Sequence, residues 1–214
     1  MMTRRTWHVA RRYFFPVLVV GALLRLFGLK RSGNTTLALA ASVLFFFRDP
    51  ERDTARGVRS VYAPADGFVT DVKEVEDAEL GPAVLVSTFL NLHNVHVNRA
   101  PFGGRIRSMR SIDGGYAPAL FGGSGENFRV RTVLDGDFGP YVLVQKAGMI
   151  ARRITPFVEP GDAVTSGERI GVIHFGSRTD VLFPAGSVRV FVKAGDRVSA
   201  GITEIARYVK EAGV

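Results

Sequence analysis

The start of the chain and the remainder have different hydrophobic patterns. Two apolar runs, residues 14–29 and 35–47, are joined by the basic and polar residues 30–34. Beyond them, short runs rich in β-branched residues are separated by Gly, Pro and Asp, which is typical of strands joined by tight turns. The pattern predicts a helical hairpin and linker over residues 1–52 and a β-rich domain over residues 53–214.

Eight strands are predicted in the second part, over residues 67–75, 83–89, 104–110, 128–132, 141–145, 169–175, 180–183 and 187–191. Helical periodicity returns only at residues 202–210, where we expect a short helix. The predicted fold class is therefore mainly β.

An internal repeat refines this prediction. Residues 158–167 and 192–201 both follow the pattern V-x-x-G-D-x-V-x-x-G, and residues 63–69 also look like a strand entry. A Gly-Asp pair suits a tight turn that leads into a strand. These features resemble the barrel-sandwich-hybrid fold of lipoyl and biotinyl carriers. No carrier lysine motif accompanies them, so the resemblance does not predict carrier function.

The N-terminal hairpin is predicted to associate with a membrane. Arginines precede, interrupt and follow the apolar runs, and each run is shorter than the roughly 20 residues of a spanning helix. We therefore expect a hairpin embedded in one leaflet, on the cytoplasmic face, as in a monotopic or peripheral protein of the cell membrane. A cleaved signal peptide and a two-pass hairpin are the alternatives.

The composition narrows the function classes. The chain has no cysteine, which excludes disulfides, thiolate nucleophiles and Cys-ligated zinc. Its formal charge of +8 indicates an anionic partner. The basic residues are spread along the chain without interleaved aromatic residues, so we expect a lipid surface and no nucleic acid.

The most informative candidate for chemistry is the pair Gly176-Ser177, which lies between two apolar runs. Its simplest interpretation is a turn. Its alternative is a peptide bond that the Ser177 hydroxyl attacks, at a glycine that tolerates a strained backbone. Elimination from the resulting ester would leave a pyruvoyl group, a ketone that accepts electrons as pyridoxal phosphate does elsewhere.

Two histidines, His93 and His96, occur close together, and three interpretations stay open for them. They are structural hydrogen-bonding groups, metal ligands, or part of a serine-type triad in which Asp66 orients a histidine toward Ser177. His174 also lies near Ser177. Strand alternation through residues 174–177 would place it on the opposite side of the strand, so no catalytic role is predicted for it.

Over nearly its whole length the chain resembles the phosphatidylserine decarboxylase proenzymes of the short prokaryotic form. The resemblance follows the N-terminal hairpin and five segments in family order: residues 46–52 (FFRDPER), 63–67 (APADG), 93–101 (HNVHVNRAP), 125–127 (GEN) and 175–181 (FGSRTDV).

The resemblance implies self-cleavage between Gly176 and Ser177. Residues 1–176 would form the larger chain, and residues 177–214 the smaller chain, headed by a pyruvoyl group derived from Ser177. Asp66 and His96 match the positions that activate the serine. His93 matches the first histidine of the family's motif, and we expect it to act in decarboxylation or protonation.

Glu126 and Asn127 match a substrate-binding motif of the family. The family usually continues this motif with Glu-Arg, whereas here Phe128 and Arg129 follow. The substrate role of Glu126 and Asn127 is therefore the least specific part of the match.

By the same resemblance, the mature enzyme would form a Schiff base with phosphatidylserine and release carbon dioxide and phosphatidylethanolamine, with no metal. The two chains would stay associated, and a homodimer is compatible with this organisation. Two alternatives remain: a non-enzymatic membrane-tethered barrel-sandwich adaptor, and a zinc peptidase on a related β-scaffold.

Overall fold

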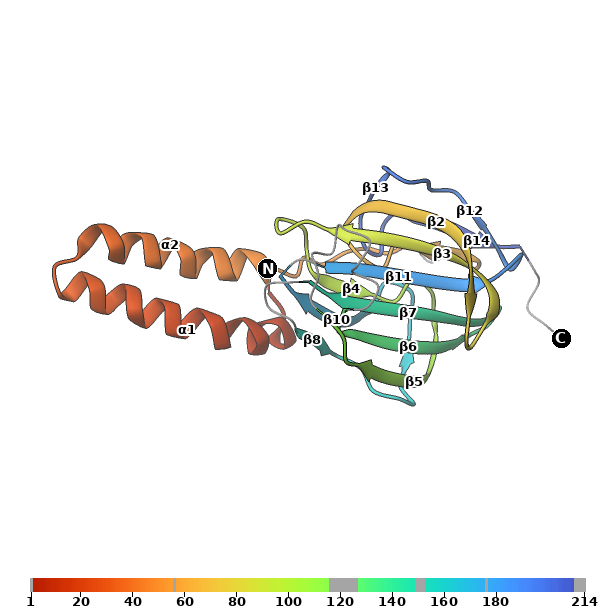
Figure 1. Cartoon of the computed structure of the whole chain (residues 1–214), viewed down its shortest axis with the longest axis horizontal. Coiled ribbons are helices and arrows are strands. Elements are labelled where there is room, and N and C mark those ends of the chain that lie inside the picture. The colour runs from red at the N-terminus through yellow and green to blue at the C-terminus, as the bar shows by residue number, and fades with distance from the viewer. Residues whose placement is uncertain (1, 56, 116–126, 149–152, 176, 210–214) are drawn as a thin grey trace. The chain divides into compact units, whose positions relative to one another are not determined.

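The computed structural model describes residues 2–55, 57–115, 127–148, 153–175 and 177–209. The chain divides into two compact units, Met1–Glu51 and Arg52–Val214 (Figure 1).

The first unit is a pair of helices, α1 (Arg4–Leu26) and α2 (Lys30–Phe46). α1 ends because Gly28 takes a positive φ of 81° and donates its N–H to the Arg25 carbonyl, while the Leu29 N–H reaches the Leu24 carbonyl. These two bonds form a Schellman motif, the common glycine-based helix end.

The predicted connector at residues 30–34 is wrong, although both helices are confirmed. These residues form the start of α2, and the turn is made by residues 27–29. Polar residues without proline are compatible with a first helical turn, whereas the glycine at position 28 marks the break. Neither helix of the described chain is long and apolar enough to cross a membrane.

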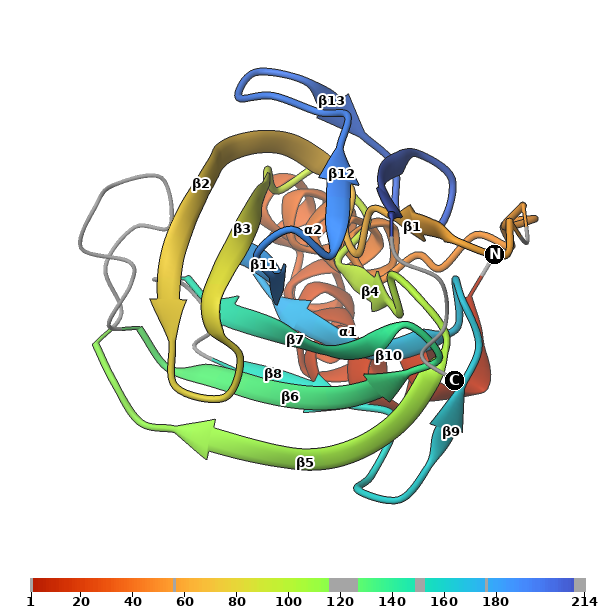
Figure 2. The same ribbon diagram turned by 90° about the vertical axis from the view of Figure 1, so that its right-hand side faces the viewer.

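The second unit is built on a strongly curled eight-stranded sheet (Figure 2). Its order is β13 (Arg197–Val198), β2 (Gly67–Asp77), β3 (Gly81–Leu90), β11 (Ser177–Pro184), β7 (Gly139–Ala147), β6 (Arg129–Gly136), β5 (Gly104–Ile112) and β9 (Ala163–Val164).

Two three-stranded sheets complete this unit. One has the order β1 (Ser60–Tyr62), β14 (Glu204–Tyr208), β12 (Val188–Val190); the other has β4 (Val97–Arg99), β10 (Arg169–His174), β8 (Arg153–Pro156). All eight predicted strands are confirmed, and so is the mainly β fold class.

The predicted helix at residues 202–210 is wrong, because this segment contains strand β14. Its Ile205, Ala206 and Tyr208 are buried, and the strand pairs with β1 on one side and β12 on the other. A strand with polar residues at only some positions mimics helical periodicity over so short a window.

The strand orders show a quasi-twofold repeat. In the large sheet β11 and β7 lie at the centre, and β3, β2 and β13 on one side correspond to β6, β5 and β9 on the other. The small sheets correspond in the same way. The repeated turns are confirmed: Gly195 donates to the Val69 carbonyl as Gly161 donates to the Ile106 carbonyl, both at 2.8 Å.

The main core lies between the large sheet and the small sheets. Val181 and Phe183 of β11, Tyr141 and Leu143 of β7, and Ile205 of β14 are buried there within one apolar cluster. Alternate positions of β11 therefore face this interior, and the positions between them face the outer side of the sheet.

Candidate active site

One end of the large sheet gathers most of the residues singled out by the sequence. Ser177, the first residue of β11, is the Cα partner of Leu90 in β3 and of Ala147 in β7. Leu90 in turn lies beside Gly67 of β2, where a side chain would overlap the backbone of β3. Since neighbouring strands are about 4.8 Å apart, the backbones of Gly67 and Ser177 are separated by roughly 10 Å.

The histidine segment begins where β3 ends at this same edge. Residues 91–94 form a turn in which Asn94 donates its N–H to the Asn91 carbonyl (2.9 Å). His93 is exposed on this turn, whereas His96 is fully buried. The His96 Nδ1 lies 3.0 Å from the Asn94 carbonyl oxygen. A carbonyl only accepts, so Nδ1 carries the proton and Nε2 of the neutral ring is the basic nitrogen.

His96 lies toward the beginning of β11. Its carbonyl accepts a hydrogen bond from Ile173 of β10, and β10 ends one residue later, shortly before Ser177. Two residues beyond His96, the buried Asn98 of β4 accepts a hydrogen bond from Thr179 of β11 (3.3 Å). This bond joins β4 to β11 two residues after Ser177.

Asp66 precedes Gly67 at the same edge but makes different contacts from those expected. Its carboxylate accepts two hydrogen bonds from the guanidinium of Arg52 (2.5 and 2.8 Å) and one from the Ala200 N–H (2.8 Å). Among the described contacts, the Asn94 carbonyl and not Asp66 binds Nδ1 of His96. The structure thus brings Asp66 to the edge without joining it to a histidine.

The backbone before Ser177 is strained. Phe175 has a φ of 50°, and it is the one non-glycine residue of the described chain with a positive φ. A bulky residue in this conformation is unusual and is found where the surroundings enforce it. Gly176, the other half of the predicted cleavage site, lies outside the described residues.

The alternation argument for His174 is wrong, because one strand does not run through residues 174–177. β10 ends at His174 and β11, in another sheet, begins at Ser177. The His174 side chain is buried, and its Nε2 lies 3.0 Å from the Thr155 hydroxyl. This contact supplies a structural role for His174.

Of the two candidate substrate-binding residues, Glu126 and Asn127, the structure describes only Asn127. Glu126 lies outside the described residues. Asn127 is buried, and its side-chain amide donates to the Ala147 carbonyl (2.9 Å), directly beside the Ser177 position. Asn127 therefore belongs to the same edge of the sheet.

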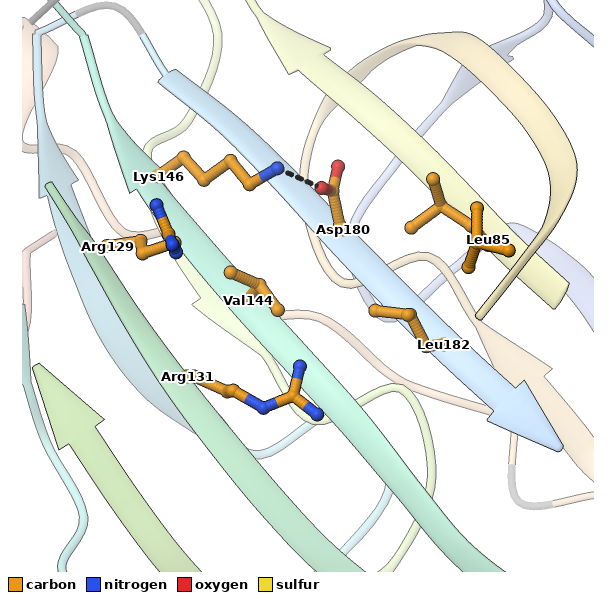
Figure 3. Close-up of a pocket in the computed structure, with 8 residues that line it drawn as sticks. Leu85, Arg129, Arg131, Val144, Lys146, Asp180 and Leu182 are labelled. Carbon is orange, nitrogen blue, oxygen red and sulfur yellow. Dashed lines mark ion pairs between the residues drawn. The ribbon is translucent and has the colours of Figure 1, made fainter. Parts of the chain in front are cut away.

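The outer face of the sheet carries a charged network next to this edge (Figure 3). The Asp180 carboxylate is buried, 2.6 Å from the Lys146 ammonium and 2.9 Å from the Arg178 guanidinium. Arg178 also donates to Asp71 and to the Ser87 hydroxyl. This network fixes the first residues of β11 to β2, β3 and β7.

A concavity of about 250 Å³ opens beside the network. Its floor contains Leu85, Val144 and Leu182, and its walls carry Arg129 and Arg131 (Figure 3). Arg131 forms an ion pair with Asp77 (2.7 Å), as Lys146 does with Asp180. These cations are thus engaged by carboxylates of the sheet itself.

No cluster of three or more His, Asp or Glu side chains suited to hold a metal ion occurs within the described ranges. The exposed His93 and the buried His96 lie on a turn and an extended segment, not on one helix face.

Sequence reasoning missed four residues of this region. They are Arg52, which binds Asp66, and Asn98, Gln145 and Thr179, which form a buried hydrogen-bonded cluster. The signal for Asn98 is its spacing of two residues from His96, which places both on one side of a strand. Nothing local in the sequence indicates Gln145, because it reaches Asn98 only through the sheet.

Comparisons with known proteins show which family the sequence matches. The profile of the phosphatidylserine decarboxylase family matches residues 39–206. The chain is 41% identical to a phosphatidylserine decarboxylase proenzyme of Streptomyces coelicolor, over 92% of this chain and 90% of that protein. It is 44% identical to the corresponding proenzyme of Streptomyces griseus, over 80% and 77%. A proposed archaetidylserine decarboxylase proenzyme of Halobacterium salinarum is 40% identical, over 97% and 100%.

The charged network predicts a pH dependence of stability. Burial alone would raise the pKa of Asp180, but Lys146 and Arg178 outweigh it, so the pKa lies below its ordinary value. A carboxyl group whose pKa is lowered by folding stabilises the protein above its unfolded pKa, and this contribution is lost as pH falls toward the folded pKa. Wild-type unfolding free energy should therefore fall below about pH 5.

We expect Asp180→Asn to be less stable at pH 7 and to lose less stability between pH 7 and pH 3 than the wild type. Urea unfolding at several pH values measures this difference. The pKa of Asp77 is also lowered, because Arg131 and the backbone N–H groups of Glu79 and Leu80 together outweigh its burial, so the stability of the variant should still fall somewhat with pH. Parallel curves for the two proteins would contradict the assignment.

Proposed function

Because the chain belongs to the phosphatidylserine decarboxylase family, we propose that it converts phosphatidylserine to phosphatidylethanolamine and carbon dioxide after cleaving itself between Gly176 and Ser177. The observation that supports this proposal is that Ser177 pairs with Leu90, which lies beside Gly67 next to Asp66, and that the His96 carbonyl bonds to Ile173 near the end of β10. The relatives from Halobacterium salinarum and Methanococcoides burtonii are named for archaetidylserine and the others for phosphatidylserine. The substrates in these names share a serine headgroup and differ in the rest of the lipid.

In the proposed self-cleavage, Ser177 acts as nucleophile and His96 as base. The serine hydroxyl adds to the preceding carbonyl, and Nε2 of His96 takes the hydroxyl proton. The C–O bond forms in this addition; the peptide C–N bond then breaks, the leaving nitrogen takes up the proton from His96, and an ester remains. Elimination then frees the carboxylate of residue 176 and leaves dehydroalanine, which takes up water and loses ammonia to give the pyruvoyl group.

The local structure supports this reaction at this peptide bond. A positive φ at Phe175 raises the energy of the uncleaved turn. β11 is held by β3 and β7 on its two edges and by Arg178 and Asp180 on its outer face. The backbone of residue 177 is thereby held in place while Phe175 carries backbone strain, and both features favour the attack.

The residues of the edge also suit the pyruvoyl group in the mature enzyme. When present, this group supplies a ketone that condenses with the serine amine and draws electrons from the carboxylate bond. We assign the exposed His93 to proton delivery, since an imidazole ring can both accept and donate a proton. Asp66, held by Arg52, would keep a negative charge near the entering amine.

The two products of cleavage are expected to stay together. The smaller piece, residues 177–214, begins with β11, which lies in the middle of the large sheet and pairs with β3 and β7 of the larger piece. Its removal would expose two strand edges and part of the core.

We also assign the quasi-twofold β unit to the barrel-sandwich type.

We further propose that the helical hairpin binds the cytoplasmic face of the membrane. Large apolar side chains are exposed on the hairpin: Trp7, Phe15, Val19, Val20, Leu23, Leu26, Phe27, Leu29, Leu39 and Phe45. Such a concentration of exposed apolar surface marks an interaction site, and the flanking arginines favour anionic lipid.

Ser177→Ala tests the function itself. We expect the variant to remain a single chain and to release no carbon dioxide from vesicles that contain phosphatidylserine, because cleavage needs the Ser177 hydroxyl and decarboxylation needs the pyruvoyl group that cleavage produces. Ser199→Ala, a change at an exposed serine of the same β unit, should leave both unchanged. Decarboxylase activity that survives Ser177→Ala would refute the pyruvoyl mechanism. A wild-type chain that neither cleaves itself nor releases carbon dioxide would favour the adaptor.

His96→Gln tests the proposed base. Loss of a general base typically costs about 10²–10⁴-fold in rate, so we expect cleavage to slow at least about a hundredfold. His174→Gln is the matched control, because His174 is equally buried but bonds to Thr155. The measurement is the half-time for loss of the full-length chain on a denaturing gel. Equal slowing by both substitutions would assign His96 a structural role only.

Replacing Leu26 and Phe27 together by Asp tests the membrane surface. These side chains are 81% and 80% exposed, and each apolar side chain of this size contributes about 1.5–3 kcal/mol when buried. Binding to anionic vesicles in a flotation assay should weaken at least about tenfold. Val58→Asp, at an 80% exposed site of the β unit, is the control. Unchanged flotation of the double variant would contradict the proposal.

A further inference from the structure

Asp66 is held by a closed ring of hydrogen bonds. The Arg52 guanidinium donates to both carboxylate oxygens, at 2.5 Å to Oδ1 and 2.8 Å to Oδ2. Arg52 also donates to the Ala200 carbonyl (2.7 Å), while the Ala200 N–H donates to Asp66 Oδ1 (2.8 Å). The side chains of Arg52 and Asp66 are only 11% and 14% exposed. A two-pronged pair of this kind holds both side chains in one orientation.

The quasi-twofold repeat of the fold offers an internal comparison for this pair. Gly201 donates its N–H to the Ala63 carbonyl, just as Gly167 donates its N–H to the Ala100 carbonyl, both at 2.8 Å. Residues 63 and 100 therefore occupy corresponding places in the two halves, as do the glycines at 201 and 167.

The position that corresponds to Asp66 is a glycine. Asp66 lies three residues after position 63, and Gly103 lies three residues after position 100. By the same correspondence, Ala200 matches Ser166. A Cβ atom on Gly103 would lie 3.8 Å from the Ser166 nitrogen, so a side chain there would approach the same backbone N–H group that Asp66 binds in the other half. The turn of the Gly103 half is closed by its backbone hydrogen bond all the same.

This comparison indicates that the turn does not require a carboxylate or its arginine. Taking two charged side chains out of water is costly, and apolar replacements of a buried ion pair are often neutral or stabilising. The fold has the pair in one half only, and this is the half in which Ser177 lies two strands from Gly67. The asymmetry points to the reaction as the reason for the pair.

We propose that Arg52 is a positioning residue of the reaction, and that it acts through Asp66. The inference rests on the function proposed above. A carboxylate has about four acceptor positions for hydrogen bonds. Within the described chain, Arg52 and Ala200 fill two of them on Oδ1 and one on Oδ2. Arg52 thereby leaves one position, on Oδ2, for a donor that takes part in the reaction.

The advantage of the pair is that Asp66 is oriented before the reaction begins. Without the guanidinium, the carboxylate would keep the Ala200 N–H as its one partner in the ring and would rotate about its side-chain bonds. Preorganised groups avoid this ordering cost during the chemical step, and a displacement of about 1 Å is enough to slow a reaction about a hundredfold.

Arg52→Gln is the test, because glutamine has neither the charge nor the two-pronged donor. The matched control is Arg131→Gln, since Arg131 and Asp77 form a comparably buried ion pair, with side chains 18% and 8% exposed, elsewhere on the sheet. Each full-length chain is synthesised in a cell-free system with phosphatidylserine-containing vesicles, and its division into two pieces is followed by intact mass. Thermal unfolding is measured in the Ser177→Ala background, in which no chain is expected to be cut.

We expect Arg52→Gln to cleave about 10–100-fold more slowly than the wild type, the usual loss when a residue that orients a reacting group is removed. Arg131→Gln should cleave within about twofold of the wild type. Both substitutions should lower the unfolding temperature, because each leaves a buried carboxylate without its arginine. Equal slowing by the two substitutions would assign Arg52 to stability alone and overturn the proposal, as would cleavage of Arg52→Gln at the wild-type rate.

A double substitution tests whether Arg52 acts through Asp66. If it does, the chain with both Arg52→Gln and Asp66→Asn should cleave within about twofold of the Asp66→Asn chain. Slowing by the product of the two single effects would show that Arg52 acts independently of Asp66, and would overturn the proposal.

If Arg52→Gln does not fold, Arg52→Lys takes its place, because lysine keeps the charge and loses the planar fork. Cleavage of this variant at the wild-type rate would overturn the positioning role. A wild-type chain that never cleaves would overturn the proposed function and this inference with it, whereas normal cleavage of both wild type and Arg52→Gln would overturn the inference alone.

Discussion

The pairing of β11 with both β3 and β7 is the constraint on which the rest of the β unit depends. It places Ser177 in a row that continues to Leu90 and Gly67 on one side and to Ala147 on the other. Backbone hydrogen bonds on both edges fix the strand, while its alternate side chains enter the core and the outer charged network. A chain cut just before this strand would keep all of these contacts.

The site breaks the symmetry of its scaffold. β11 and β7 are related by the quasi-twofold repeat, so Ser177, the first residue of β11, corresponds to Gly139, the first residue of β7, which carries no hydroxyl group. The same holds for the small sheets, where His174 ends β10 and the buried Tyr208 ends β14. The two halves of the repeated fold thus carry different residues at the positions of the proposed site.

Much of the fold could be predicted from the sequence because its signals are local. β-branched runs, Gly-Asp turns and two apolar segments identify eight strands, the repeat and both helices. Short strands such as β1, β4 and β14 escaped, since pairing partners far along the chain define them. The connector between the two helices was predicted at the polar residues 30–34, although Gly28 is the residue that ends the first helix.

The candidate site could be predicted only in part from the sequence. Motif order identifies Asp66, His96 and Ser177, but not what each touches. Arg52 binds Asp66, and the Asn94 carbonyl sets the tautomer of His96. Both are contacts created by folding, as are the links from Asn98 to Gln145 and Thr179. Residue identity gives the chemistry, and the sheet register decides which groups act on one another.

The intact mass of the purified, denatured wild-type chain tests the central claim most directly. The account predicts two species divided between Gly176 and Ser177, the smaller one lighter by one ammonia than a peptide that begins with serine. A single species of the full 214-residue mass, unchanged after incubation with phosphatidylserine vesicles, would contradict it.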